Sequence, residues 1–129
     1  MNSDASRAEQ RRLVDAFLAA AREGDFEELV AVLDPDVVLR ADRGALPVGA
    51  RLPDLVRGAT QVAEQLLTRA PRFARFARRA VVNGAAGLVI VPAHRPVAVV
   101  GFTIAKGRIV ELDLIADPEK LHAVTVDDV

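Results

Sequence analysis

Residues 107–121 read GRIVELDLIADPEKL, and this stretch decides more about the fold than any other part of the chain. Side chains alternate along a strand, so the run has two faces. One face is wholly apolar and is the expected core face; its members are Val110, Leu112, Leu114 and Ala116. The other face mixes apolar and acidic side chains; its members are Ile109, Glu111, Asp113 and Ile115. Two carboxylates this close repel each other unless water, a cation or an arginine lies nearby, so this second face suits solvent, a partner surface or the wall of a polar cavity.

The composition is that of one globular domain. The chain has 129 residues, of which 51% are hydrophobic and 27% are charged, with a net charge of -1. This charge gives no general attraction to nucleic acid or to anionic membranes, so we expect no direct nucleic-acid binding and no membrane association. The N-terminus lacks the apolar segment of a secretory signal, and no apolar run approaches the roughly 20 residues of a membrane span. The expected location is therefore cytoplasmic.

Apolar periodicity in the first half of the chain predicts three helices. The expected segments are residues 7–23, 25–34 and 55–70. Gly24 is a typical stop for the first helix, and Asp25 with Glu28 three residues later forms a capping box for the second. Pro71 is expected to end or kink the third helix, because proline lacks the backbone donor that a helix interior needs.

Apolar and β-branched runs predict the strands. They are expected at residues 37–42, 79–82, 87–91, 97–104 and from residue 107 onward. The dipeptides Asn83-Gly84 and Lys106-Gly107 mark tight turns, and glycine and proline predict a loop at residues 44–53 and a turn at residues 92–96. The predicted class is α+β, with about three N-terminal helices packed on a curved antiparallel sheet to form a cone. The open end of such a cone is a common place for a pocket.

Six side chains are candidates for lining such a pocket. They are Leu39, Val62, Leu66, Phe102, Ile104 and Asp113. The five apolar members are also what an ordinary core contains, since buried aliphatic and aromatic side chains fill every domain. A pocket lining and a plain core are therefore both open for these five positions.

Catalytic chemistry has little support in the residue types present. Proton transfer needs a carboxylate base and a donor for the developing oxyanion. The candidate bases are Asp42, Glu111 and Asp113, and the candidate donors are Arg40, Asn83, His94 or a protonated acid. The chain has no tyrosine and no cysteine, and its only serines, Ser3 and Ser6, are N-terminal. The two histidines, His94 and His122, are not at ligand spacing with any nearby acid. We therefore expect no enzyme activity, no metal and no cofactor.

One local charge run stands out, at residues 69–79, which read RAPRFARFARR. Arginine recurs there at every third residue, with two phenylalanines between the arginines. If the run is helical, it forms a basic ridge that could contact phosphates or an acidic partner. The other interpretation is a solvated face whose arginine stems cover apolar surface.

The order of these elements resembles the nuclear-transport-factor-2-like (NTF2-like) cone, in its SnoaL-like branch. Three segments look like the C-terminal extension of one group of extracytoplasmic-function sigma factors; they are residues 17–42, 81–91 and 107–121. In those proteins a SnoaL-like domain follows two helical sigma modules. The resemblance covers residues 10–121, which makes residues 1–9 a linker or disordered tail and residues 122–129 a C-terminal tail.

The resemblance also points to two short motifs. In the family an Asn-Pro-Asp-Lys-Leu-type motif follows the last strand. The matching residues are Asp117, Pro118, Glu119, Lys120 and Leu121, with an acid for the amide and a longer acid at the third place. An Asp-Gly-Gly-Gly-Lys-type motif follows the first strand of the family. Asp42 and Gly44 match it, whereas Arg43 and Ala45 depart and no lysine follows. The resemblance implies that these two segments contact a partner.

The resemblance implies a regulatory, non-catalytic role. The partners would be the helical sigma modules and RNA polymerase in the full-length protein, and the effect would be on transcription initiation. The chain has no room for those modules before Arg7, so it is expected to be either an excised domain or a freestanding relative. The alternatives are a freestanding SnoaL-like small-molecule binder or isomerase/cyclase-type enzyme, and a homodimerisation module that uses the outer face of its sheet. Residues 117–121 could also simply close the last strand.

Overall fold

The structure, a computed structural model, describes residues 6–42, 55–69, 71–91, 97–116 and 126–128. The helices are α1 (Arg7–Glu23), α2 (Phe26–Val32), α3 (Ala59–Arg69) and α4 (Pro71–Phe76). The strands are β1 (Leu33–Asp42), β2 (Leu55–Arg57), β3 (Ala77–Val82), β4 (Ala85–Ile90), β5 (Ala98–Ala105), β6 (Arg108–Ile115) and β7 (Val126–Asp128). The predicted α+β class is confirmed, and the loop expected at 44–53 and the turn expected at 92–96 lie outside the described residues.

The first helix begins and ends where the sequence predicts, whereas the second ends earlier than predicted, at Val32, because residues 33–35 belong to β1. The Ser6 hydroxyl accepts a hydrogen bond from the Glu9 backbone N–H at 3.1 Å, which caps α1. Gly24 ends this helix with a φ of 68°, a left-handed conformation that glycine adopts without strain. The Asp25 carboxylate accepts from the Glu28 N–H at 3.1 Å and caps α2. Local sequence chemistry is therefore sufficient to set the starts of both helices.

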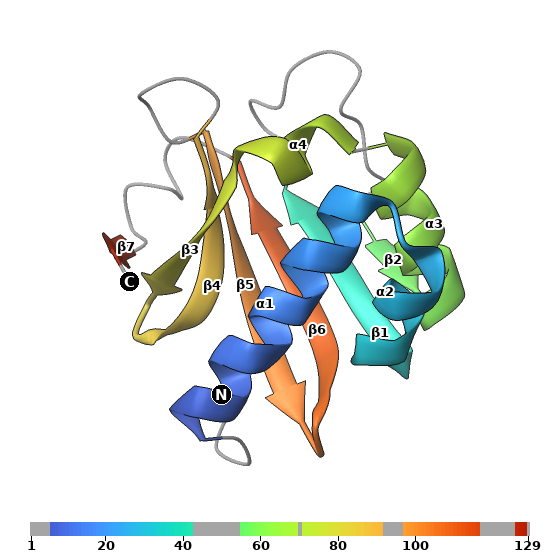
Figure 1. Cartoon of the computed structure of the whole chain (residues 1–129), viewed down its shortest axis with the longest axis horizontal. Coiled ribbons are helices and arrows are strands. Elements are labelled where there is room, and N and C mark those ends of the chain that lie inside the picture. Colours follow the sequence, from blue (N-terminus) through green and yellow to red (C-terminus); the bar gives the residue numbers. More distant parts are fainter. Residues whose placement is uncertain (1–5, 43–54, 70, 92–96, 117–125, 129) are drawn as a thin grey trace.

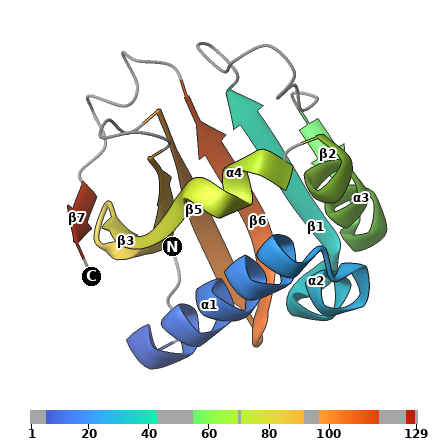
Figure 2. The same cartoon turned by 45° about the horizontal axis from the view of Figure 1, so that its top comes forward.

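The strands form one sheet in the order β2-β1-β6-β5-β4-β3-β7. The pair β1 and β6 is parallel, and every other neighbouring pair among the described strands is antiparallel. Figures 1 and 2 show α1 lying across one face of this sheet, with α2 and α3 beside β1 and β2. We call the face under the helices the helix face and the opposite one the outer face. The parallel pair brings the N-terminal part of the chain next to its last long strand.

The helix face carries the main core. Phe17 of α1 meets Phe102 of β5 edge to face, with ring centroids 5.2 Å apart. The largest side chains below 2% exposure are Leu29, Leu33, Leu39, Ile104, Ile109, Leu112, Val14, Val37, Val62 and Val99. All of these except Val99 belong to this core. A small second cluster lies on the outer face; its buried members are Ala80, Val82, Val89 and Val99.

The prediction of which side chains of β6 face the core is wrong at the beginning of the strand. Thr103 of β5 pairs with Glu111, but the next residue, Ile104, pairs with Ile109, so Val110 is an extra residue in β6. Such a bulge reverses the alternation locally. Ile109 is consequently fully buried on the helix face, whereas Val110 is half-buried. Beyond the bulge the prediction holds, because Leu112 is buried and Glu111 and Asp113 lie on the outer face, in register with Val38 and Arg40.

The predicted start of the third helix is wrong. Residues 55–57 form the short strand β2, which pairs with Val38, Leu39 and Arg40 of β1. Gly58 then takes a φ of 94° and donates its N–H to the Val37 carbonyl at 2.8 Å, so the helix begins only at Ala59. Pairing with an available strand outweighs the helical periodicity here. A new helix, α4, begins at Pro71, where the missing N–H of proline costs nothing.

Two other expectations change. Residues 77–82 are a strand, so Arg78 and Arg79 point to opposite faces and do not extend a helical basic ridge. The segment predicted as a C-terminal tail, residues 122–129, contains β7, which pairs with β3. The strand at 79–82 is already expected from the sequence, whereas β7 results from cross-strand pairing that the local sequence does not indicate. At the other end of the chain, α1 starts at Arg7, inside the segment predicted as a linker.

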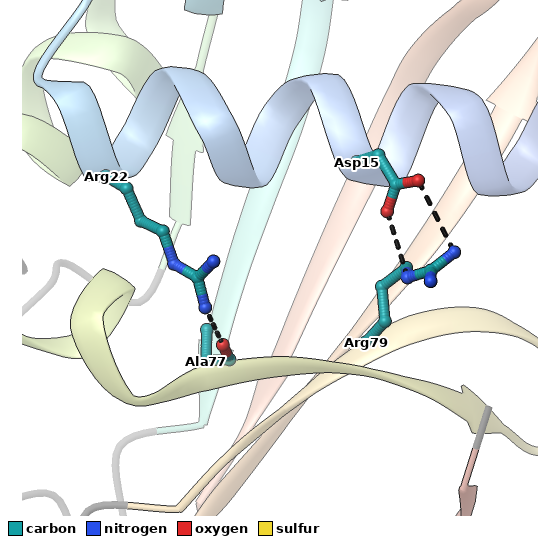
Figure 3. A network of polar contacts seen from close by, with 4 residues as sticks. All are labelled: Asp15, Arg22, Ala77 and Arg79. Carbon is teal, nitrogen blue, oxygen red and sulfur yellow. Dashed lines mark hydrogen bonds and ion pairs between the residues drawn. The ribbon is translucent and has the colours of Figure 1, made fainter.

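Two arginines fasten α1 to the α4–β3 segment, as Figure 3 shows. Arg22 donates from Nε to the Ala74 carbonyl at 3.0 Å and from Nη2 to the Ala77 carbonyl at 2.6 Å. Arg79 of β3 pairs with Asp15, its Nε lying 3.1 Å from Oδ1. The Arg22 contacts satisfy backbone carbonyls at the point where α4 becomes β3, so they add to the pairing of Ala77 with Ile90 at this junction.

We predict that Arg22→Met lowers the free energy of unfolding by about 1–2 kcal/mol, because the variant keeps the apolar stem but loses two charge-assisted hydrogen bonds. The matched control is Arg12→Met, also on α1, whose ion pair with Glu9 is exposed and 3.8 Å long. The control should change stability by less than about 0.5 kcal/mol. Urea unfolding followed by circular dichroism measures both, and equal effects would contradict this role for Arg22.

Two glycines on the outer face should respond oppositely to substitution. A Cβ at Gly87 would lie 2.7 Å from the Val100 carbonyl oxygen and 2.9 Å from Val82 Cγ2. A Cβ at Gly101 would meet nothing within 4 Å. We therefore expect Gly87→Ala to cost about 1–3 kcal/mol and Gly101→Ala to be neutral or stabilising. Urea midpoints of the two variants check this, and a Gly101→Ala loss as large as that of Gly87→Ala would refute it.

Candidate functional site

The acidic residues of β6 meet an arginine from β1 on the outer face. Parallel pairing sets Arg40 beside Asp113 and Val38 beside Glu111. The Arg40 Nε lies 3.5 Å from Glu111 Oε2. Both side chains are partly exposed, so this ion pair contributes little to stability by itself. It does provide the arginine that two neighbouring carboxylates need, and it joins the three side chains into one charged group.

Asp113 differs chemically from an ordinary surface acid. Burial raises its pKa from 3.8 to about 6, the hydrogen bond and the negative charge of Glu111 raise it as well, and Arg40 opposes these effects. A protonated Asp113 donates a hydrogen bond to Glu111, and this bond contributes to the raised pKa of Asp113. The group therefore changes charge close to neutral pH.

A groove of about 400 Å³ lies next to this charged group. Its lining residues are Arg40, Val82, Asn83, Ala85, Ala86, Gly101, Phe102, Asp113, Leu114 and Ile115. Strand alternation directs the Arg40 and Asp113 side chains to the outer face, away from the helices. Gly101 is the cross-strand partner of Asp113, and the space where its side chain would stand is empty. One end of the groove is charged, and its walls are mostly apolar.

The six predicted pocket residues fall into two groups. Leu39, Val62 and Ile104 are at most 2% exposed in the core under the helices, and Leu66 is partly buried against the same core. Phe102 packs on Phe17 and also borders the outer-face groove, which Asp113 lines directly. The structure therefore places the five apolar residues in or against the core and Asp113 at the groove, which Phe102 also borders. It does not bring all six together in one pocket.

The predicted partner-contact residues begin at the ends of β1 and β6. Asp42 is the last residue of β1 and pairs with Ile115, the last residue of β6. Ala116 follows and is 1% exposed. Arg43, Gly44 and the segment from Asp117 through Pro118, Glu119 and Lys120 to Leu121 lie outside the described residues. The two motif segments therefore start from neighbouring points at one end of the sheet.

Sequence reasoning missed several groove residues. It named Arg40 and Asn83 only as possible proton donors, and it did not single out Val82, Ala85 or Gly101. The spacing of Glu111 and Asp113 was the feature of the sequence that indicated a charged site, because two carboxylates on one strand face require a nearby cation. Which arginine supplies this cation depends on the β1–β6 pairing.

In the described ranges no group of three histidine or acidic side chains could hold a metal. His94 and His122 lie outside them.

The chain has the NTF2-like cone fold, and several of the solved structures that it resembles are NTF2-like proteins. A neighbour of particular interest is the extracytoplasmic function sigma factor SigJ of Mycobacterium tuberculosis, with a TM-score of 0.68 and 26% sequence identity. The match covers 88% of this chain but only 44% of SigJ, so the chain spans less than half the length of that protein.

Two further neighbours share the fold over most of their own length. An NTF2-like protein of unknown function from Burkholderia xenovorans LB400 matches with a TM-score of 0.60 and 18% identity, over 86% of this chain and 85% of that one. A putative isomerase from Bacillus subtilis matches with a TM-score of 0.52 and 13% identity, over 83% and 85%. No family profile and no curated protein sequence matches the chain. None of the described helices is long and apolar enough to cross a membrane.

We predict that Asp113→Asn removes the loss of folding stability that ionisation of Asp113 causes at high pH. Because the folded pKa of about 6 exceeds the unfolded value of 3.8, the contribution of Asp113 to stability is fully present below about pH 4 and is lost as the pH rises through 6. At pH 8 the variant should therefore be more stable than the wild type by about 1 kcal/mol, a figure reduced for partial solvent screening. Below about pH 4 the difference should disappear.

Urea unfolding at pH 3.5, 6 and 8 tests this expectation. The control is Glu64→Gln, which removes one carboxylate from an exposed position of α3. It should leave the pH dependence of the wild type unchanged. A pH-independent effect of Asp113→Asn would contradict the assignment.

Proposed function

We propose that the chain is a regulatory, non-catalytic domain that modulates transcription initiation through contacts with helical sigma modules and RNA polymerase. The single observation that carries the proposal is the register of the parallel pair β1–β6, in which Asp42 and Ile115 are partners. Two segments that resemble motifs of sigma-factor extensions follow these positions. The likeness to SigJ, the one neighbour reported above that is named as a sigma factor, supports the same role.

Parallel pairing matters because it sends both strands out of the sheet at the same end. The segment that starts with Arg43 and the segment that starts with Asp117 therefore leave from adjacent strands. Ala116, which directly follows β6, is buried, so the chain is anchored in the core just before Asp117. A proline, a cation and an apolar residue in the second segment, at Pro118, Lys120 and Leu121, are suitable for docking on a helical neighbour. The described exit points, Asp42 and Ile115, are therefore neighbours in the sheet although they lie far apart along the chain.

A non-catalytic role is supported by the composition of the described part. Tyrosine is absent, and Leu39, Val62 and Ile104 fill the region under the helices with apolar side chains. Two of the acids that could act as bases, Glu111 and Asp113, lie on the outer face beside Arg40 and are not directed into that core. This arrangement favours binding over proton transfer.

The alternative is a freestanding small-molecule binder or isomerase/cyclase-type enzyme. It is favoured by the Burkholderia protein and the putative isomerase, of which this chain covers 85% each. At their identities these likenesses carry the fold alone. Homodimerisation through the outer face also stays a prediction, which sedimentation at several concentrations tests.

The decisive experiment measures binding of the chain to the helical extracytoplasmic-function sigma modules of its source organism, fused in cis and added in trans. The double variant Lys120→Glu with Leu121→Asp should weaken the interaction at least about tenfold, because a like-charge contact and a buried polar group replace favourable ones. The control is Lys106→Glu, an exposed lysine in the turn at the opposite end of β6. It should change the affinity by less than about twofold.

No measurable interaction in either arrangement would refute the proposal. If the double variant and the control lose the same affinity, the contact depends on overall charge. The part of the proposal that assigns the contact to the strand-end segments would then be wrong.

A further inference from the structure

We infer that the outer-face groove is a binding site for a small organic cation, with an ammonium or guanidinium group beside Asp113 and an apolar body lying over Gly101. This site opens on the face opposite the helices, and the core residue Phe102 borders it. It is built around Asp113 and Gly101 and uses no residue of the segments at 43–44 or 117–121, so neither proposal depends on the other. The inference stands on the shape of the groove and on the distribution of charge at its end.

Among the described residues, the charged end of the groove has one positive charge for two carboxyl groups. The described groups facing Asp113 are Glu111 on its own strand and Arg40 on β1, while its partner on β5 is the uncharged Gly101. With both carboxylates ionised, one arginine faces two negative charges. Arg40 Nε contacts Glu111 at 3.5 Å, and it lowers the pKa of Asp113 less than burial and Glu111 together raise it. A second cation beside Asp113 would complete the pairing.

The rest of the groove fits an apolar body. A Cβ built at Gly101 meets no atom within 4 Å, so the strand is hollow at that position. Val82 and Ala85 lie on one side of this hollow and Ile115 on the other, and Val82 and Ile115 also belong to the second apolar cluster. The volume of about 400 Å³ is in the range of small-molecule sites. A cation with a ring or short alkyl chain matches both the charge and the lining.

The chemistry predicts a specific pH dependence. A cation beside Asp113 takes the place of the proton that this carboxyl carries at low pH, so binding requires ionised Asp113 and competes with its protonation. With a pKa of about 6 in the free protein, the ionised fraction rises about tenfold between pH 5 and pH 7. The apparent affinity should rise by the same factor, and a neutral ligand of the same shape should show no such change.

The experiment titrates the full chain with 2-phenylethylamine and, in parallel, with its neutral counterpart 2-phenylethanol. Backbone amide shifts in nuclear magnetic resonance spectra report both the affinity and the place of binding. The amine should shift the amides of Gly101, Asp113 and Ile115, and its affinity should rise about tenfold from pH 5 to pH 7. The alcohol should bind at least about tenfold more weakly at pH 7, because it lacks the charge-assisted contact.

Two variants test the two halves of the site independently. Asp113→Asn should weaken amine binding at least about tenfold and abolish its pH dependence. Gly101→Val should block the hollow while the chain remains folded, because its side chain enters empty space in a strand that favours β-branched residues. The control Glu64→Gln removes a carboxylate elsewhere and should leave amine binding unchanged.

The inference is overturned if the amine shows no saturable binding, or if the alcohol binds as tightly as the amine. Amide shifts confined to the helices would also overturn it. Unchanged amine binding in a folded Gly101→Val chain would do the same. These outcomes are independent of the sigma-module assay, which depends on Lys120 and Leu121.

Discussion

The parallel pairing of β1 with β6 is the constraint on which the rest of this structure depends. It joins the strand that directly follows α2 to the last long strand of the C-terminal meander. It buries Leu39 and Leu112 as neighbours on one face and sets Arg40 beside Asp113 on the other. The core, the charged group and the common exit point of the two motif segments all follow from this single register.

The bulge at Val110 makes that register compatible with both neighbours of β6. Its extra residue turns Ile109 into the core while Leu112 stays buried, so the strand keeps a continuous apolar helix face. The pairing of β1 with β6 is irregular over the same stretch, between Leu33 and Val38. Bulges bend and twist a strand, which suits a sheet that curves around α1. The outer face then presents Glu111 and Asp113 together.

The outer face combines two features that are unusual for a sheet without helices over it. Gly87 and Gly101 are cross-strand partners, so no side chain stands at either position. Gly87 permits the close approach of Val82 and the Val100 carbonyl, whereas Gly101 leaves open space beside Asp113. At this level of the sheet, the backbone is therefore tightly packed at Gly87 of β4 and open at Gly101 of β5. The titrating carboxyl of Asp113 lies beside the open position.

The sequence by itself determined the elements whose signals are local. Capping at Ser6 and Asp25, the turns at Asn83-Gly84 and Lys106-Gly107, and the alternation from Glu111 onward depend on neighbours a few residues away. The family resemblance extended this to the whole α+β cone. Only the tertiary structure decided β2, β7, the bulge, the groove and the choice of Arg40 as the cation beside the acids. Each of these depends on which strand lies next to which, and pairing between distant segments is set by packing of the whole chain rather than by local residue preference.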